Sequence, residues 1–159
     1  MRSLLPFFIH TVPLQMRATE LSLATAVIVG CMFKIMHWPG ASILVVSGGC
    51  LLALFYFPFG FRTLPAPKQT DQVLWMTLLG GASLSVALYG QVAFIQRWPH
   101  STTFLVAGAV GCALSLLAGL ALRLKPHRAD IYLDGILIRC LVVGGLAFTL
   151  WFLFAGKPR

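Results

Sequence analysis

Apolar residues occur along this chain in long runs separated by short polar segments. Three runs, residues 40–61, 72–96 and 101–122, contain no charged residue. Two more, residues 18–38 and 131–156, carry charges near their ends. About 20 apolar helical residues cross the hydrocarbon core of a bilayer, so each run is a candidate transmembrane helix. The pattern predicts an all-α, polytopic membrane protein with five transmembrane helices.

A Trp-Pro pair interrupts the apolar sequence twice, at Trp38–Pro39 and at Trp98–Pro99. One straight helix over residues 18–61 would be roughly 65 Å long, about twice the thickness of the hydrocarbon core. The chain must therefore turn near its middle. Proline disfavours helix in the residue before it and suits the first position of a new helix. We expect each tryptophan to end one helix and each proline to begin the next.

The two turns belong to a longer repeat. When Pro39 is placed on Pro99, Gly30 falls on Gly90, Gly48 on Gly108 and His37 on Arg97. The sequence therefore predicts two helical hairpins related as a parallel repeat, because an even number of spans separates equivalent helices. The expected units are an N-terminal interfacial segment, two hairpins and a fifth helix, at residues 1–17, 18–61, 72–124 and 131–156. Pro6 and Pro13 are expected to interrupt any helix in the first of these.

The composition supports lipid as the surroundings of this protein. The chain is 58% hydrophobic and 10% charged, with a net charge of +8, whereas a soluble domain carries about 25% charged residues. Its cations lie between the apolar runs, where the positive-inside rule and anionic headgroups place them, so no nucleic-acid partner is expected. None of the four cysteines forms a CxxC pair, which indicates structural thiols.

The distribution of cations predicts an orientation in a bacterial inner membrane. Seven lie on the side of the N-terminus, namely Arg2, Arg17, Arg62, Lys68, Arg123, Lys125 and Arg128. Four lie on the opposite side, namely Lys34, Arg97, Lys157 and Arg159. The excess predicts a cytoplasmic N-terminus, a periplasmic C-terminus and periplasmic Trp-Pro turns.

The residues around the turns are the leading site candidates. We expect tryptophan to fix the depth of each turn at headgroup level, and the neighbouring cation to extend its stem to the same interface. The residues concerned are Lys34, His37, Trp38, Pro39 and Gly40 in the first turn, and Arg97, Trp98 and Pro99 in the second.

Arg139 is the deepest charge in the predicted spans. We expect it to face the inside of the bundle or to reach the cytoplasmic interface, since a charged side chain is costly in contact with hydrocarbon. A stripe of small residues along the fourth span, Ala107, Gly111, Ser115 and Gly119, predicts close helix packing. Sequence alone leaves open whether that packing is within one bundle or between subunits.

No catalytic motif accompanies these features. The chain has no nucleophile–base pair, glycine-rich phosphate loop or metal motif, and its four acids lie near the predicted cytoplasmic ends. His37 and His100 could face each other at the turns, but a bis-histidine haem is disfavoured because both lie at span ends. We therefore expect neither a cofactor nor an enzymatic activity.

One segment carries a family resemblance. Residues 30–42, GCMFKIMHWPGAS, resemble the first-hairpin signature G-x-x-F-K-I-x-H-x-P-G-A of the GldL-type gliding-motility and type IX secretion motor subunits of Bacteroidetes. The resemblance implies a shared hairpin and a Bacteroidetes source. It does not carry over the motor activity, because the second helix lacks the membrane carboxylate of that family, and the long cytoplasmic tail is also missing. The second hairpin keeps Gly90, Trp98 and Pro99 of this segment.

Two interpretations of function follow. The first is a non-enzymatic structural or accessory subunit that packs in a homo-oligomer or a larger membrane complex. The second is an ion- or solute-conducting, motor-type component. A hydrated cavity lined by Lys34, Gln91, Gln96 and Arg139 would favour the second, whereas the same groups turned to interfaces around a dry core would favour the first.

Overall fold

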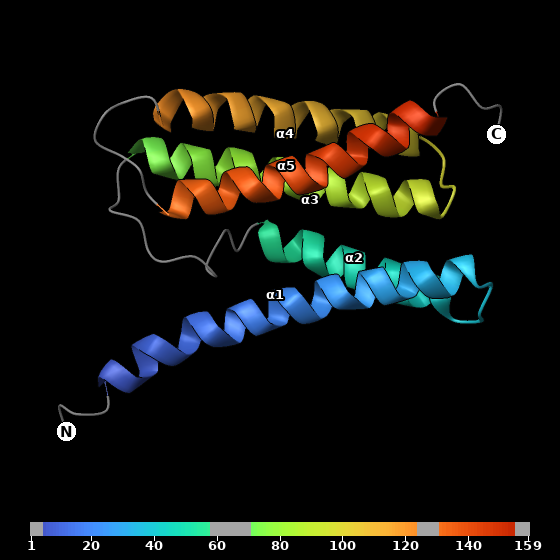
Figure 1. The fold of residues 1–159 in the computed structure, drawn as a ribbon, viewed down its shortest axis with the longest axis horizontal. Coiled ribbons are helices and arrows are strands. Elements are labelled where there is room, and N and C mark those ends of the chain that lie inside the picture. Colours follow the sequence, from blue (N-terminus) through green and yellow to red (C-terminus); the bar gives the residue numbers. More distant parts are fainter. Residues whose placement is uncertain (1–4, 58–70, 124–130, 155–159) are drawn as a thin grey trace.

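The computed structural model describes residues 5–57, 71–123 and 131–154 of the chain, which form five α-helices and no strand. The helices are α1 (Leu5–Ile35), α2 (Ala41–Tyr56), α3 (Asp71–Ile95), α4 (Ser101–Arg123) and α5 (Ile131–Phe154). They run alternately up and down, so that both Trp-Pro turns and the end of α5 lie at the same end of the molecule (Figure 1). The predicted all-α, polytopic membrane fold is confirmed.

Four helices contain segments long and apolar enough to cross a bilayer: Arg17–Ile35, Leu74–Ile95, Ser101–Arg123 and Tyr132–Phe154. Together they make the protein a multi-pass membrane protein. α2 has only 16 residues, about 24 Å at helical rise, which is shorter than a hydrocarbon core of about 30 Å. The second predicted run continued to residue 61, but residues 58–61 lie outside the described part.

The first helix is longer than its apolar run suggested. α1 begins at Leu5 and continues through Pro13 as one helix of 31 residues. The expectation that Pro13 interrupts the helix was therefore wrong. A proline removes one backbone donor, and a helix can accommodate that loss locally, by a kink or a small adjustment, without ending. An interfacial location for residues 5–17 stays a prediction.

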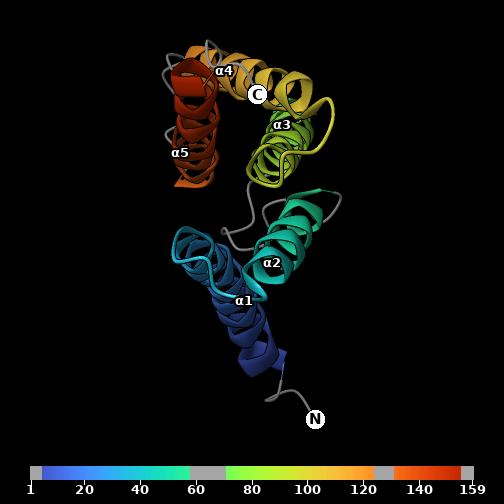
Figure 2. The same cartoon turned by 90° about the vertical axis from the view of Figure 1, so that its right-hand side faces the viewer.

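α3 is the central helix of the bundle. It packs against α2, α4 and α5, whereas α1 packs against α2 alone. The end-on view shows α1 and α2 as one pair beside a three-helix group of α3, α4 and α5 (Figure 2). The buried core lies where α2 meets that group, with Leu84 of α3, Cys112 of α4 and Ile136 of α5 fully buried. The first hairpin therefore joins the bundle mainly through α2.

Equivalent glycines make equivalent contacts in the two hairpins. A Cβ atom added to Gly30 would lie 3.0 Å from Val45, and one added to Gly90 would lie 2.7 Å from Leu105, sixty positions further on. Gly48 likewise faces Val27, and Gly108 faces Ala87, again sixty positions on. Glycine allows helix backbones to approach closely in lipid. The two hairpins therefore close through the same pairs of positions.

Candidate functional site at the Trp-Pro turns

The first turn ends α1 with a Schellman motif. The Trp38 N–H donates to the Phe33 carbonyl at 2.9 Å, and the His37 N–H donates to the Lys34 carbonyl at 3.2 Å. His37 takes the left-handed conformation, with φ 58°. The rings of Phe33 and Trp38 pack with centroids 4.8 Å apart, which supplies the hydrophobic contact that often accompanies this motif. Together these interactions use carbonyls that the end of a helix leaves without partners.

A second tight turn follows at once. The Ala41 N–H donates to the Trp38 carbonyl at 3.4 Å, and Gly40 has φ 86° and ψ −11°. These angles are those of the third residue of a type II turn. Such a turn favours proline at its second position and glycine at its third. Pro39 and Gly40 therefore hold the positions that this turn requires.

The second Trp-Pro turn has the same hydrogen bonds. Trp98 donates to the Ala93 carbonyl at 2.9 Å and Arg97 to the Phe94 carbonyl at 3.1 Å, while Ser101 donates back to Trp98 at 3.4 Å. Arg97 replaces His37 at φ 59°, and His100 replaces Gly40 at φ 60°. Since a left-handed conformation costs a non-glycine residue roughly 1–2 kcal/mol, the second turn is the more strained.

The predicted helix boundaries at these turns need correction. α1 ends at Ile35 and α2 begins at Ala41, so Trp38 and Pro39 lie between the helices. Trp98 and Pro99 lie in the same way between Ile95 and Ser101. The expectation that proline starts the second helix was wrong because a Schellman motif followed by a type II turn occupies five residues. Gly40 is the N-cap of α2.

Lys34 joins the first hairpin to the second. Its Nζ donates to Gln96 Oε1 at 2.5 Å and to Ser42 Oγ at 3.4 Å. Gln96 in turn donates through Nε2 to the Ser42 carbonyl at 3.2 Å. Lys34 is half-buried, so its ammonium is held between the turns. The amide of Gln96, placed beside Lys34 by packing of α2 on α3, is its nearest partner within the chain. The expected position of Lys34 at the level of the headgroups stays a prediction.

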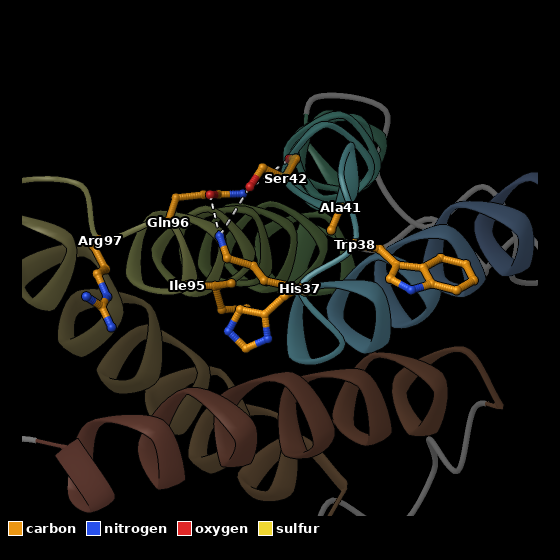
Figure 3. A pocket seen from close by; sticks show the side chains of 8 residues that line it. His37, Trp38, Ala41, Ser42, Ile95, Gln96 and Arg97 are labelled. Atoms are coloured by element: carbon orange, nitrogen blue, oxygen red, sulfur yellow. Dashed lines mark hydrogen bonds between the residues drawn. The ribbon is translucent and has the colours of Figure 1, made fainter.

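These side chains border a hollow of about 490 Å³ between the two turns. Its lining residues are Lys34, His37, Trp38, Ala41, Ser42, Ile95, Gln96 and Arg97. Lys34 donates to Gln96 and Ser42, and Figure 3 shows Arg97 in the second turn, with the Trp38 indole directed away from Gln96 and Ser42. We call this space the turn hollow. It brings together four of the predicted turn residues, Lys34, His37, Trp38 and Arg97.

A second polar cluster lies further along the bundle. Arg139 of α5 donates from Nε to Glu20 Oε1 at 2.7 Å and from a terminal nitrogen to Glu20 Oε2 at 2.8 Å. The Tyr56 hydroxyl donates to the same Glu20 Oε1 at 2.5 Å. Arg139 also donates to the Gly135 carbonyl at 3.1 Å. The Arg139 side chain is therefore directed at Glu20 of α1, and a functional role for this charge stays a prediction.

Glu20 is the functional candidate that sequence reasoning missed. The sequence marks it only as one of four acids near the predicted cytoplasmic ends of the helices. Its side chain is only 13% exposed, and that of Arg139 only 21%. A signal was present, because opposite charges inside transmembrane segments usually pair with one another.

The remaining polar groups also bridge helices. Gln91 donates to the Val143 carbonyl at 2.8 Å, which links α3 to α5. Ser115 donates to Ser83 at 3.3 Å, which links α4 to α3. A conducting path was expected to be lined by Lys34, Gln91, Gln96 and Arg139. Of these four residues, Lys34 and Gln96 line the turn hollow, whereas Gln91 and Arg139 form their hydrogen bonds elsewhere.

The small-residue stripe of α4 packs within the chain, but not through all its members. Ser115 and Gly119 are buried, and Gly111 lies against Ser83. Ala107 is exposed, and Gly108 is the residue that meets α3. The stripe advances four residues at each step, whereas a straight helix has 3.6 residues per turn. Its first member therefore rotates out of the interface that its last members occupy.

No group of three or more histidines, cysteines or acids able to hold a metal ion occurs in the described residues. His37 and His100 are exposed, each in its own turn. The four cysteines are free thiols, with Cys112 and Cys140 buried.

Comparison with known proteins adds to this geometry at the first hairpin. Residues 22–80 match the GldL N-terminal domain. The match begins within α1, includes the first Trp-Pro turn and all of α2, and ends in α3. The α1–α2 pair is therefore a GldL-like hairpin, as the residues around Lys34 indicated. The search of curated proteins and the search of solved structures returned no match.

Proposed function

We propose that this protein is a non-enzymatic, multi-pass subunit of a bacterial inner-membrane complex, in which the GldL-like hairpin is held on a bundle of three further helices. The supporting observation is the use made of its intramembrane polar groups. Lys34 bonds to Gln96 at one end of the hairpin, and Glu20 bonds to Arg139 at the other. These groups fasten helices to one another, which is the arrangement expected of a structural subunit.

The partner in this proposal is another membrane subunit or a second copy of the chain. Among the described helices, only α2 lies close to the backbone of α1, and residues 17–35 of α1 expose large apolar side chains, including Leu21, Ile28 and Met32. Transmembrane helices associate through such surfaces when shape and small residues allow close packing. Likeness to the GldL N-terminal domain supports assembly within a larger complex.

The test is purification of the full chain from its native membrane in mild detergent. We expect it to emerge as a homo-oligomer or with another membrane protein in fixed stoichiometry, measured by light scattering and mass spectrometry. Arg139→Met, which frees the hairpin from α5, should reduce the recovered complex. The matched control is Arg123→Gln, which removes an exposed cation at the end of α4. A lone monomer from the native membrane would contradict the proposal.

A motor-type or conducting role is the second candidate. The observation that favours it is the Glu20–Arg139 ion pair inside spanning helices, because intramembrane ionisable groups commonly serve ion pathways. The full chain in liposomes that contain a pH-sensitive dye would then pass protons, and Glu20→Gln would abolish the flux. Tight liposomes with the unaltered chain would leave the structural role as the supported one.

A further inference from the structure

The turn hollow has an unbalanced positive charge. Lys34 and Arg97 both line it, and the chain has no acid between Glu20 and Asp71 or between Asp71 and Asp130. The two ion pairs found among the described residues join Arg139 to Glu20 and Arg123 to Asp134. The oxygen nearest to the Lys34 ammonium is the neutral amide oxygen of Gln96. A half-buried cation without a counter-charge is costly, so the hollow is suited to an anion.

The side chains around the hollow place it at the membrane–water boundary. Trp38 is 54% exposed and Trp98 37% exposed, one in each turn. Tryptophan concentrates at the level of the lipid headgroups, where its ring is in the apolar layer and its N–H meets water. Two exposed isoleucines adjoin lining residues in sequence and form an apolar rim there: Ile35, which follows Lys34, is 78% exposed, and Ile43, which follows Ser42, is 73% exposed. Such a rim needs contact with hydrocarbon, which a soluble anion does not supply.

We propose that the turn hollow binds the phosphate of an anionic phospholipid headgroup between the two Trp-Pro turns. Arg97 and Lys34 are its cationic ligands, and the Ser42 hydroxyl is a further donor. Guanidinium can donate two parallel bonds to phosphate, whereas ammonium acts as a point charge. The acyl chains lie against the exposed faces of Ile35 and Ile43. The site is independent of whether the protein is a structural subunit or a conductor.

The binding test uses the full chain purified in mild detergent and delipidated. Phosphatidylglycerol and phosphatidylcholine are titrated separately, and retained lipid is counted by native mass spectrometry. We expect the chain to prefer phosphatidylglycerol. The double variant Lys34→Met/Arg97→Gln should weaken that binding by about thirtyfold, from roughly 1 kcal/mol for each cation. The charge-retaining variant Lys34→Arg/Arg97→Lys should keep most of the binding.

The matched control is Arg17→Gln, which removes an exposed cation from the opposite end of the same membrane span. It should leave lipid binding unchanged. Equal loss in Arg17→Gln would mean attraction to net charge alone and would overturn the site, as would full binding by the double variant. Displacement of the lipid by inorganic phosphate would show a phosphate site without lipid selectivity, and would overturn the assignment to lipid. A thermal unfolding midpoint close to that of the unaltered chain establishes that the double variant is folded.

Discussion

Arg139 and Glu20 form a two-point ion pair between helices whose backbones do not pack against each other. The nitrogen–oxygen distances are 2.7 and 2.8 Å, and 119 positions separate the residues in sequence. α1 packs against α2 alone, so this pair is a side-chain link between the first helix and the last. The Tyr56 hydroxyl on the same carboxylate brings α2 into the link.

Removal of one partner should therefore destabilise the protein strongly. We expect Arg139→Met to lower the free energy of unfolding by about 3 kcal/mol, because the Glu20 carboxylate would be left largely buried without its counter-charge. The double variant Glu20→Met/Arg139→Met should recover most of the loss, since an apolar pair avoids that cost. Denaturant unfolding in mixed micelles measures both. The control is Arg123→Gln, whose pair with Asp134 is 52% and 39% exposed, and which should cost less than about 1 kcal/mol. Equal losses in Arg139→Met and the control would contradict this account.

Substitution of the residue that follows the proline should change the free energy of unfolding in opposite directions in the two Trp-Pro turns. His100 holds a left-handed conformation that Gly40 holds without strain in the equivalent position. His100→Gly should raise the free energy of unfolding by about 1 kcal/mol, and Gly40→Ala should lower it by a similar amount. Thermal unfolding in detergent checks both. Gly145→Ala is the control, because Gly145 lies in helix α5 with nothing within 4 Å of an added Cβ; it should be neutral or slightly stabilising. A loss on His100→Gly would contradict the assigned turn.

Neighbouring residues of α4 should differ sharply in their tolerance of bulk. A Cβ atom at Gly108 would lie 2.3 Å from the Ala87 Cα, which is backbone and cannot rotate away. Gly108→Val should therefore force α3 and α4 apart and cost roughly 1–3 kcal/mol or more. Ala107→Leu should be tolerated, because Ala107 is exposed to the surrounding solvent or lipid. Comparison of the two unfolding midpoints decides the point, and a large loss at Ala107 would place that face in a subunit interface.

The orientation in the membrane can be tested by labelling cysteines from outside. We expect Thr103→Cys, next to the second turn, to react with a membrane-impermeant maleimide in intact cells. Ala18→Cys lies near the start of the first span, at the opposite side of the membrane from the turns, and should react only after the cells are opened. Both positions are exposed, and the parent protein with its own four cysteines gives the background. Reaction of both positions in intact cells would refute the predicted topology, and reversed reaction would place the Trp-Pro turns in the cytoplasm.

The local features of the protein could be predicted from its sequence. Long apolar runs fix the helices, because a backbone in lipid must satisfy its own hydrogen bonds. The bilayer thickness requires a turn within residues 18–61, and the segment around Lys34, His37 and Pro39 indicated the GldL-like hairpin. The ends of the helices at those turns could not be fixed, since they depend on the left-handed residues His37 and Gly40, and nothing in composition requires a histidine to take that conformation.

Sequence alone determined the helices, the two hairpins with their turns at one end, and the likeness of the first hairpin to the GldL N-terminal domain. Only the tertiary structure decided which polar groups meet. Lys34 bonds to Gln96 across 62 positions, and Glu20 bonds to Arg139 across 119. Helix formation in lipid depends on residues close in sequence, so its signal is local and periodic. The partner of a charged side chain depends on how whole helices rotate and pack, and that is set by close contacts such as Gly108 on Ala87, which no single helix specifies.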